Sequence, residues 1–213
     1  MRLYLSSFRN GNKPKELLKL LGTGRRTALI ANSIDFLDEP ARSDGVAQEI
    51  ERLKSIELDP VEIDLRQYFG KSEELRELLS TFDLIWARGG NTFILRRAFK
   101  QSGADKIVKE LLAEDKIVYG GYSAGIDMLV PSLHGVEFVD DPNIVPAGYE
   151  PAIVWDRLGL LPYVIAPHYK SDHPESADID KSVQYLIDHH IPFIALRDGE
   201  VIIVKGGEQG IVV

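Results

Sequence analysis

Cysteine is absent from the 213-residue sequence, and basic side chains are outnumbered by acidic ones. Without thiols the chain cannot form a disulfide, a thiolate metal site or a cysteine nucleophile. The 25 lysines and arginines against 33 aspartates and glutamates give a formal net charge of −8. This charge repels phosphate backbones and anionic lipid, and no dense basic cluster offsets it locally. We therefore expect neither a nucleic acid nor a membrane surface as a partner.

Long apolar runs are also missing. No stretch approaches the ~20 apolar residues that a transmembrane helix needs. The apolar stretch after Arg2 stops at Ser6, too short for a secretory signal, so we expect a cytoplasmic protein. Hydrophobic residues make up 44% and charged residues 27% of the chain, which is typical of a folded globular protein. Because no repeat or linker-like change in composition interrupts it, residues 1–213 are expected to form a single domain.

Short β-rich runs alternate with segments of helical periodicity, which indicates an α/β sheet with crossover helices. Ser43 and Ser72 are expected to cap helices, and Asp198–Gly199 to form a hairpin turn between two late strands. Residues 131–162 contain five prolines and show no period, so we expect short strands or turns there, or part of a site. Strands are expected at 3–5, 27–31, 61–65, 82–87, 116–119, 163–166, 193–196, 201–204 and 210–213, and helices near 17–21, 44–53, 73–79, 92–100, 107–112, 123–129 and 178–188.

The segment Gly121–Gly125 matches the pattern G-x-S-x-G between an expected strand and an expected helix. In this context the pattern typifies a nucleophile on a tight turn, where side chains at the two glycine positions would crowd the backbone. Ser123 is the candidate nucleophile, and the amide of Ala124 is a candidate donor to a developing oxyanion. The alternative is a tight turn in which Ser123 only caps the helix.

A serine at its free pKa is a poor nucleophile and needs a base. His168 directly follows an apolar strand, and open α/β sheets build their sites at the carboxyl ends of strands. The alternative for His168 is a partly buried side chain hydrogen-bonded to the backbone. His134 and His173 lie in polar, loop-like sequence and are expected at the surface, while His189 and His190 lie at a helix end.

The loop Arg88–Thr92 also follows a strand and opens a helix. Such a glycine-containing loop can hold a phosphate or donate a backbone N–H to an oxyanion. A phosphate site has little support, because the sequence contains neither G-x-x-x-x-G-K-[ST] nor a G-x-G-x-x-G motif with its ribose-binding acid. The loop can equally be a turn in which Asn91 or Thr92 caps the helix.

Together, these motifs resemble those of peptidase E, the α-aspartyl dipeptidase family of serine peptidases related to cyanophycinase. The resemblance lies in Gly89–Phe93, Gly121–Gly125, Pro167–Tyr169 and the closing turn Leu196–Gly199. It implies a doubly wound, mostly parallel sheet flanked by helices, similar to class I glutamine amidotransferase domains. It also implies a metal-independent enzyme without a cofactor, in which Ser123 is the nucleophile and His168 its base. The amides of Gly90 and Ala124 would line the oxyanion hole, with Asn91 and the neighbouring cation Arg88 as candidate substrate contacts.

The resemblance implies an acidic residue in the turn after the late strands, and the matching position is Asp198. A positional argument supports this choice, since strand 193–196 follows a crossover helix and should lie beside the strand that ends at Ala166. Residues 197–199 would then lie next to His168, where an acid can accept the imidazole N–H. The rival acids are Glu150, Asp140 and Asp141, in the irregular stretch before His168.

The leading hypothesis is a serine exopeptidase that hydrolyses short peptides, such as dipeptides with an N-terminal aspartate, through an acyl-enzyme. An acidic side chain of the substrate would need a local cation, and Arg88, Arg197 and Lys170 lie next to motif residues. One alternative is an α/β-hydrolase esterase whose acid is Asp140, Asp141 or Asp156. Another is a non-catalytic module that binds a small anionic ligand. The oligomeric state stays open, with a homo-oligomer among the options.

Overall fold

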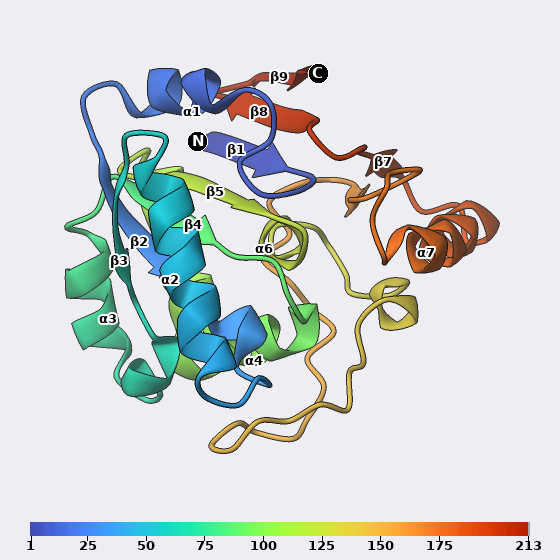
Figure 1. The fold of residues 1–213 in the computed structure, drawn as a ribbon, viewed down its shortest axis with the longest axis horizontal. Coiled ribbons are helices and arrows are strands. Elements are labelled where there is room, and N and C mark those ends of the chain that lie inside the picture. The colour runs from blue at the N-terminus through green and yellow to red at the C-terminus, as the bar shows by residue number, and fades with distance from the viewer. Residues whose placement is uncertain (213) are drawn as a thin grey trace.

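The computed structural model describes residues 1–212 and centres on a seven-stranded sheet of order β3-β2-β4-β5-β1-β8-β9 (Figure 1). The first five strands of that order pair in parallel, and β8 and β9 run antiparallel at one edge. The expected mostly parallel α/β sheet with a C-terminal hairpin is therefore confirmed. The strands are β1 (Arg2–Ser6), β2 (Arg26–Ile30), β3 (Asp59–Glu62), β4 (Leu84–Ala87), β5 (Val118–Tyr122), β8 (Val201–Lys205) and β9 (Glu208–Val212).

Helices cover both faces of this sheet, because successive side chains of each strand point to opposite faces. One buried cluster packs Tyr4, Leu29 and Trp86 against α1 and α2, and a second packs Leu3 and Ile85 against α3, α4, α5 and α6. Within residues 1–212, no helix is both long and apolar enough to cross a membrane. The helices are α1 (Pro14–Leu21), α2 (Ala41–Lys54), α3 (Ser72–Leu79), α4 (Thr92–Ser102), α5 (Ala104–Ala113) and α6 (Ala124–Asp127).

A second, two-stranded sheet lies beside the main one. β6 (Val164–Ala166) pairs in parallel with β7 (Phe193–Ala195), and Ala166 is opposite Ala195 in the register. A parallel pair needs a crossover connection, which α7 (Ser176–Asp188) provides. The prediction that these two strands are neighbours is confirmed. The segments that follow them, which carry His168 and Asp198, therefore start next to each other.

The prediction of a hairpin turn at Asp198–Gly199 is wrong. β7 belongs to the small sheet, whereas β8 pairs with β1 in the large one, so this turn connects two sheets. The hairpin instead joins β8 to β9 through Gly206 and Gly207, a two-residue loop in which Gly206 has a φ of 64°. The last expected strand, 210–213, matches β9 as far as Val212, and Val213 lies outside the described residues.

Several local expectations also need correction. Neither Ser43 nor Ser72 caps a helix, because α2 already begins at Ala41 and α3 includes Ser72. The Ser43 hydroxyl donates to the carbonyl of Pro40 instead. The expected strand 61–65 is displaced to β3, since the Asp64 carboxylate accepts from the amide of Arg66 and starts a 3₁₀ turn, η2 (Leu65–Tyr68). The expected helix 123–129 shortens to α6.

Residues 131–162 are largely irregular, as expected. They contain the 3₁₀ turn η3 (Val136–Phe138) and one isolated antiparallel bridge between Ser132 and Asp156. Arg97, buried on α4, holds this stretch through hydrogen bonds to the carbonyls of Pro142, Ala152 and Pro151. One arginine therefore satisfies several carbonyls that have no partner in regular secondary structure.

Candidate active site

The candidate residues lie on segments that leave the carboxyl ends of strands. Gly90 follows β4, Ser123 follows β5, His168 follows β6 and Asp198 follows β7. Gly90, Ser123 and His168 line one open cleft of about 160 Å³. Parallel strands bring residues that are far apart in the sequence to the same end of a sheet. The cleft lies where the segments that follow β4 and β5 of the large sheet meet the segment that follows β6 of the small sheet.

Ser123 occupies a strained turn between β5 and α6. Its φ of 49° and ψ of −123° are rare for a side chain that is not glycine. The flanking glycines are required by close packing, since a Cβ at Gly121 or Gly125 would collide with the carbonyl oxygen of Ala87 on β4. The Ser123 side chain makes no capping hydrogen bond to α6. The structure thus presents the hydroxyl in the cleft instead of using it to cap the helix.

His168 and Asp198 are joined by a direct hydrogen bond, with Nδ1 of the imidazole 2.7 Å from Oδ1 of the carboxylate. Ser7, just past β1, connects the same two residues, because its hydroxyl donates to Asp198 Oδ1 at 2.9 Å and accepts from the His168 amide at 2.8 Å. The Asp198 amide donates to Ser171 Oγ at 2.8 Å. His168 has a φ of 59° and is only 1% exposed. Its ring orientation is therefore fixed from several sides.

Two aromatic rings pack against the His168 imidazole. The His173 ring stacks on it with centroids 3.7 Å apart and an interplanar angle of 7°, and the Phe8 ring meets it edge-on at 5.5 Å. Burial lowers the pKa of His168 below its ordinary value, the charge of Asp198 opposes this shift, and the charge of His173 adds to it. A neutral imidazole is the form that can accept a proton.

The other acids considered as partners of His168 are engaged elsewhere. Asp140 Oδ2 accepts from the amide of Thr92 at 2.8 Å, and Asp141 Oδ1 accepts from the amide of Asn143 at 2.9 Å. Glu150 and Asp156 are exposed. Within the described chain, none of these four carboxylates hydrogen-bonds to His168, whereas Asp198 does.

The Gly89–Gly90 turn is held by Ser33, from the short 3₁₀ turn η1 (Asn32–Ile34). The Ser33 hydroxyl lies 2.8 Å from the carbonyl of Gly89, and its own carbonyl accepts from the Asn91 amide at 2.8 Å. Gly90 has a φ of 144°, and a Cβ there would approach the Ser33 carbonyl oxygen to 2.7 Å. Only glycine fits this backbone path, which brings the Gly90 backbone to the wall of the cleft.

The Asn91 side chain is engaged within the protein. Asn91 Oδ1 caps α4 by accepting from the Ile94 amide at 3.0 Å, and its Nδ2 donates to the Asp141 carbonyl at 3.0 Å. Arg88 lines the cleft. Its Nη1 donates to the Gly89 carbonyl at 2.7 Å, while its buried Nε makes no hydrogen bond within the described residues.

The two other expected cations lie outside this cleft. Lys170 pairs with Asp180 at 2.6 Å and is half exposed, and the Arg197 side chain is exposed. Neither residue lines the cleft that contains Ser123. Of the three cations considered from the sequence, the structure therefore brings Arg88 alone to this cleft.

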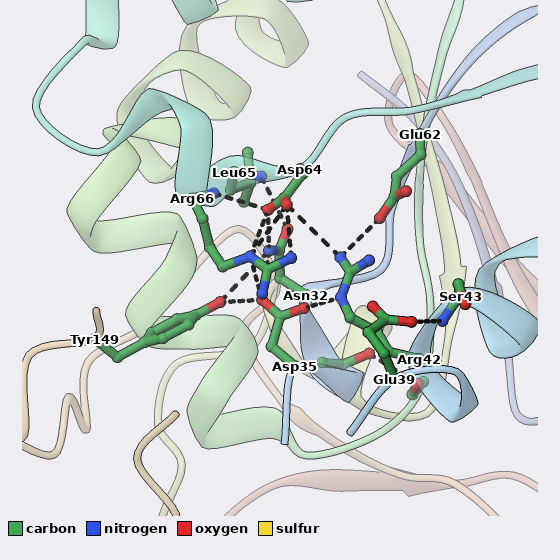
Figure 2. A network of polar contacts seen from close by, with 12 residues as sticks. Asn32, Asp35, Glu39, Arg42, Ser43, Glu62, Asp64, Leu65, Arg66 and Tyr149 are labelled. Atoms are coloured by element: carbon green, nitrogen blue, oxygen red, sulfur yellow. Dashed lines mark hydrogen bonds and ion pairs between the residues drawn. The ribbon is translucent and has the colours of Figure 1, made fainter. Parts of the chain in front are cut away.

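A network of polar side chains hydrogen-bonds to η1 (Figure 2). Figure 2 shows Asp35 between Tyr149 and Arg42: the tyrosine hydroxyl donates to Oδ2, and Arg42 Nε donates to Oδ1 at 2.7 Å. Asn32 Nδ2 also donates to Asp35, at 2.7 Å. The network ties η1 to α2, to η2 and to the irregular stretch 131–162. Its remaining charged members are Glu62, Asp64 and Arg66.

His168, His173 and Glu175 form the one cluster of potential metal ligands within residues 1–212, with one ligand atom of each within 4.8 Å of the others. The stacked rings keep the nitrogen lone pairs in nearly parallel planes, so they do not converge on one point. In addition, Nδ1 of His173 accepts from the Glu175 amide at 3.3 Å. This arrangement does not match the tetrahedral geometry of a zinc site.

Sequence reasoning missed several residues of the site. His173 was expected at the surface but lines the cleft and stacks on His168. Glu175, in the same polar segment, lies 4.0 Å from His168 Nε2. Ser7 contacts residues more than 160 positions away. No periodicity or motif marks these contacts, because they arise only when β1 and the small sheet come together.

Comparisons with known proteins identify the family and support the fold. The family model described as "Peptidase family S51" matches residues 42–212. An uncharacterized peptidase of Listeria innocua is 32% identical over 70% of this chain and 71% of its own length. Peptidase E of Streptomyces coelicolor is 30% identical over 68% of this chain, but the match spans only 57% of that protein. The crystal structure of a peptidase E-type protein from Listeria monocytogenes superposes with a TM-score of 0.80, at 22% identity, over 99% of this chain and 97% of its own.

The family model covers most of the chain, including the segments that carry Gly90, Ser123, His168 and Asp198. The structural likeness, at 22% identity, independently supports the fold. The chain therefore belongs to peptidase family S51 and is a serine peptidase.

Proposed function

We propose that the protein is an exopeptidase that hydrolyses short peptides through Ser123, His168 and Asp198, with dipeptides that begin with aspartate among its substrates. The observation that carries the proposal is the 2.7 Å hydrogen bond between His168 and Asp198, next to a cleft that His168 shares with a serine on a strained turn. A nucleophile, its base and an orienting acid are the three groups that serine acyl transfer needs.

In this mechanism, Ser123 Oγ attacks the carbonyl carbon of the scissile bond while Nε2 of His168 takes its proton. Asp198 holds Nδ1–H and stabilises the imidazolium that forms. The amides of Gly90 and Ala124 donate to the oxyanion. The tetrahedral intermediate then collapses, His168 protonates the leaving amine, and a water activated by the same imidazole releases the acid from Ser123.

The size and charge of the cleft support a short substrate. Its volume of about 160 Å³ is small beside the roughly 300–1,000 Å³ of typical small-molecule sites. Arg88 lines this cleft with a buried Nε that has no hydrogen-bond partner within the described residues. The guanidinium of Arg88 would bind the carboxylate of an N-terminal aspartate.

The esterase alternative receives less support. In α/β-hydrolases the catalytic acid precedes the histidine in the sequence. Of the acids that precede His168 here, Asp140 accepts from the Thr92 amide, Asp141 accepts from the Asn143 amide, and Asp156 is exposed. Asp198, the acid that hydrogen-bonds to Nδ1 of His168, instead follows the histidine in the sequence.

A dipeptide panel that varies the N-terminal residue tests the proposal. We expect Ser123→Ala to lower kcat by ~10⁴ or more on every cleaved dipeptide, with an unchanged circular dichroism spectrum. His189→Ala, an exposed histidine at the end of α7, is the matched control and should retain full activity. Undiminished turnover by Ser123→Ala would refute the mechanism.

A further inference from the structure

A small inner pocket adjoins the cleft at Ser123. Its volume is about 10 Å³, which is close to the space that one water molecule needs. Ser123 and Glu175 line both the cleft and this pocket. A group of one heavy atom that enters the pocket therefore lies directly beside the candidate nucleophile.

Three carboxyl groups line this inner pocket, from Asp127, Asp140 and Glu175, and within the described chain no lysine or arginine does. Asp127 is 4% exposed, and its Oδ1 makes no hydrogen bond within the described residues. Its nearest cation is Arg157, whose Nη1 lies 3.8 Å away. Asp140 accepts from the Thr92 amide, and Glu175 Oε2 lies 4.0 Å from His168 Nε2.

Burial raises the pKa values of all three acids, and repulsion between carboxylates adds to the rise at two of them. Burial raises the pKa of Asp127 and of Glu175 to about 7, and nearby carboxylates add to both shifts, while the charge of Arg157 opposes the shift at Asp127. Burial also raises the pKa of Asp140. Arg157 is the one cation beside these three groups that the described residues provide, and Asp127 Oδ1 still has no hydrogen-bond donor. A small cation among the three carboxyl groups would supply further positive charge and hydrogen-bond donors.

The covalent geometry of a peptide determines which cation can reach this position. The α-nitrogen of the first residue is two bonds, about 2.5 Å, from the carbonyl carbon that the nucleophile attacks. With an attack distance of roughly 3–3.5 Å, that nitrogen lies within about 6 Å of the attacking oxygen. Ser123 lines two spaces within that reach, the cleft, which carries the cation Arg88, and the inner pocket, which three carboxyl-bearing residues line. An ammonium group is attracted to the inner pocket and repelled by Arg88.

We infer that the inner pocket is an ammonium subsite, in which Glu175, with Asp127 and Asp140, binds the free α-amino group of the peptide's first residue. This inference rests on the proposed peptidase mechanism and adds a substrate requirement to it. The ammonium group points inward and the rest of the peptide extends into the cleft past Arg88. Peptides with a blocked amino terminus are excluded, because an acyl group is uncharged and larger than the pocket.

Three forms of one substrate test the inference on the wild-type protein. They are the dipeptide that the panel identifies as best cleaved, its N-acetyl form and its des-amino form. For Asp-Leu the des-amino form is succinyl-Leu, which keeps the carboxylate and the scissile bond. We expect kcat/KM to fall at least 100-fold for the acetyl form and at least 10-fold for the des-amino form. Equal rates for the three forms would overturn the subsite while leaving the peptidase mechanism intact.

A Glu175→Gln variant then assigns the subsite to this side chain. We expect kcat/KM for the free dipeptide to fall at least 10-fold, and that for the des-amino form to change less than threefold. A parallel loss on both forms would overturn the assignment, since it would place Glu175 in support of His168 only. Asp188→Asn changes an exposed acid at the last residue of α7, the helix that Glu175 precedes; it is the control and should leave both rates unchanged.

The two proposals fail in different ways. If the wild type cleaves none of the dipeptides, and Ser123 does not react with a fluorophosphonate, the peptidase mechanism itself fails and the subsite fails with it. If Glu175→Gln does not fold, the comparison of the three substrate forms on the wild type still decides the matter.

Discussion

At the scale of single residues, His168 depends on two groups that come from distant parts of the chain. Asp198 binds its Nδ1, and Ser7 connects the Asp198 carboxylate to the His168 amide. The charge of Asp198 raises the pKa of His168, against the effects of burial and of His173. Ser7 acts through these two residues, so we assign it a positioning role.

We predict that Asp198→Asn lowers kcat by up to ~10⁴, because an amide favours the wrong tautomer of the imidazole. It should also move the rising limb of the pH profile of kcat/KM to lower pH. The sign follows from the base being active when neutral: Asp198 raises the pKa of His168, so its removal lowers that pKa. Asp172→Asn, an exposed acid in the same loop as His173, should change neither quantity. A limb that moves upward would contradict the assignment.

We also predict that Ser7→Ala lowers kcat roughly 10- to 100-fold with little change in KM, because a hydrogen bond to a charged acceptor such as Asp198 contributes about 1.5–3 kcal/mol. Steady-state kinetics on the best-cleaved dipeptide measures this. The neighbouring Ser6→Ala removes a hydroxyl that donates to the Phe8 carbonyl instead, and should leave kcat unchanged. A change confined to KM would argue against a positioning role for Ser7.

The residues that the sequence could predict are those in local motifs. Ser123, Gly90 and Ala124 lie in glycine-containing turns between a strand and a helix, and His168 directly follows a strand. The pairing of Asp198 with His168 needed an argument about which strands are neighbours. Ser7 and Glu175 carry no such signal, because their contacts depend on packing between separate sheets and helices.

At the scale of secondary-structure elements, the short turn η1 connects the polar network to the cleft. Ser33 fixes the Gly89–Gly90 turn, and Asn32 and Asp35 hold η1 on the network. Most strands and helices of the chain could be predicted from the sequence, because their apolar residues recur at regular spacing. It misplaced β3, because the side-chain hydrogen bond of Asp64 starts the turn η2 there, and it placed the starts of α2 and α3 too late.

We predict that Tyr149→Phe destabilises the protein by about 1.5–3 kcal/mol, because its hydroxyl donates to the buried carboxylate of Asp35. Urea denaturation of the two proteins measures the difference. Tyr185→Phe is the matched control, since its hydroxyl makes no hydrogen bond within residues 1–212, and it should change stability by less than about 0.5 kcal/mol. Equal stabilities for wild type and Tyr149→Phe would contradict the role of the network.

At the scale of the whole molecule, two sheets together build the site. The large sheet contributes Ser7, Gly90 and Ser123 from the ends of β1, β4 and β5, and the small sheet contributes His168 and Asp198. The α/β class and the mostly parallel sheet could be predicted from the alternation of strands and helices in the sequence. The division into two sheets could not be predicted, because two strands separated by Asp198–Gly199 equally fit a hairpin.

The most direct test is reaction of the protein with a fluorophosphonate, followed by intact mass measurement and peptide mapping. We predict one added phosphonyl group per chain, located on Ser123, which is absent from Ser123→Ala and forms much more slowly in His168→Ala. A protein that stays unlabelled, or that carries the label on a different serine, would contradict the assignment of Ser123 as a nucleophile activated by His168.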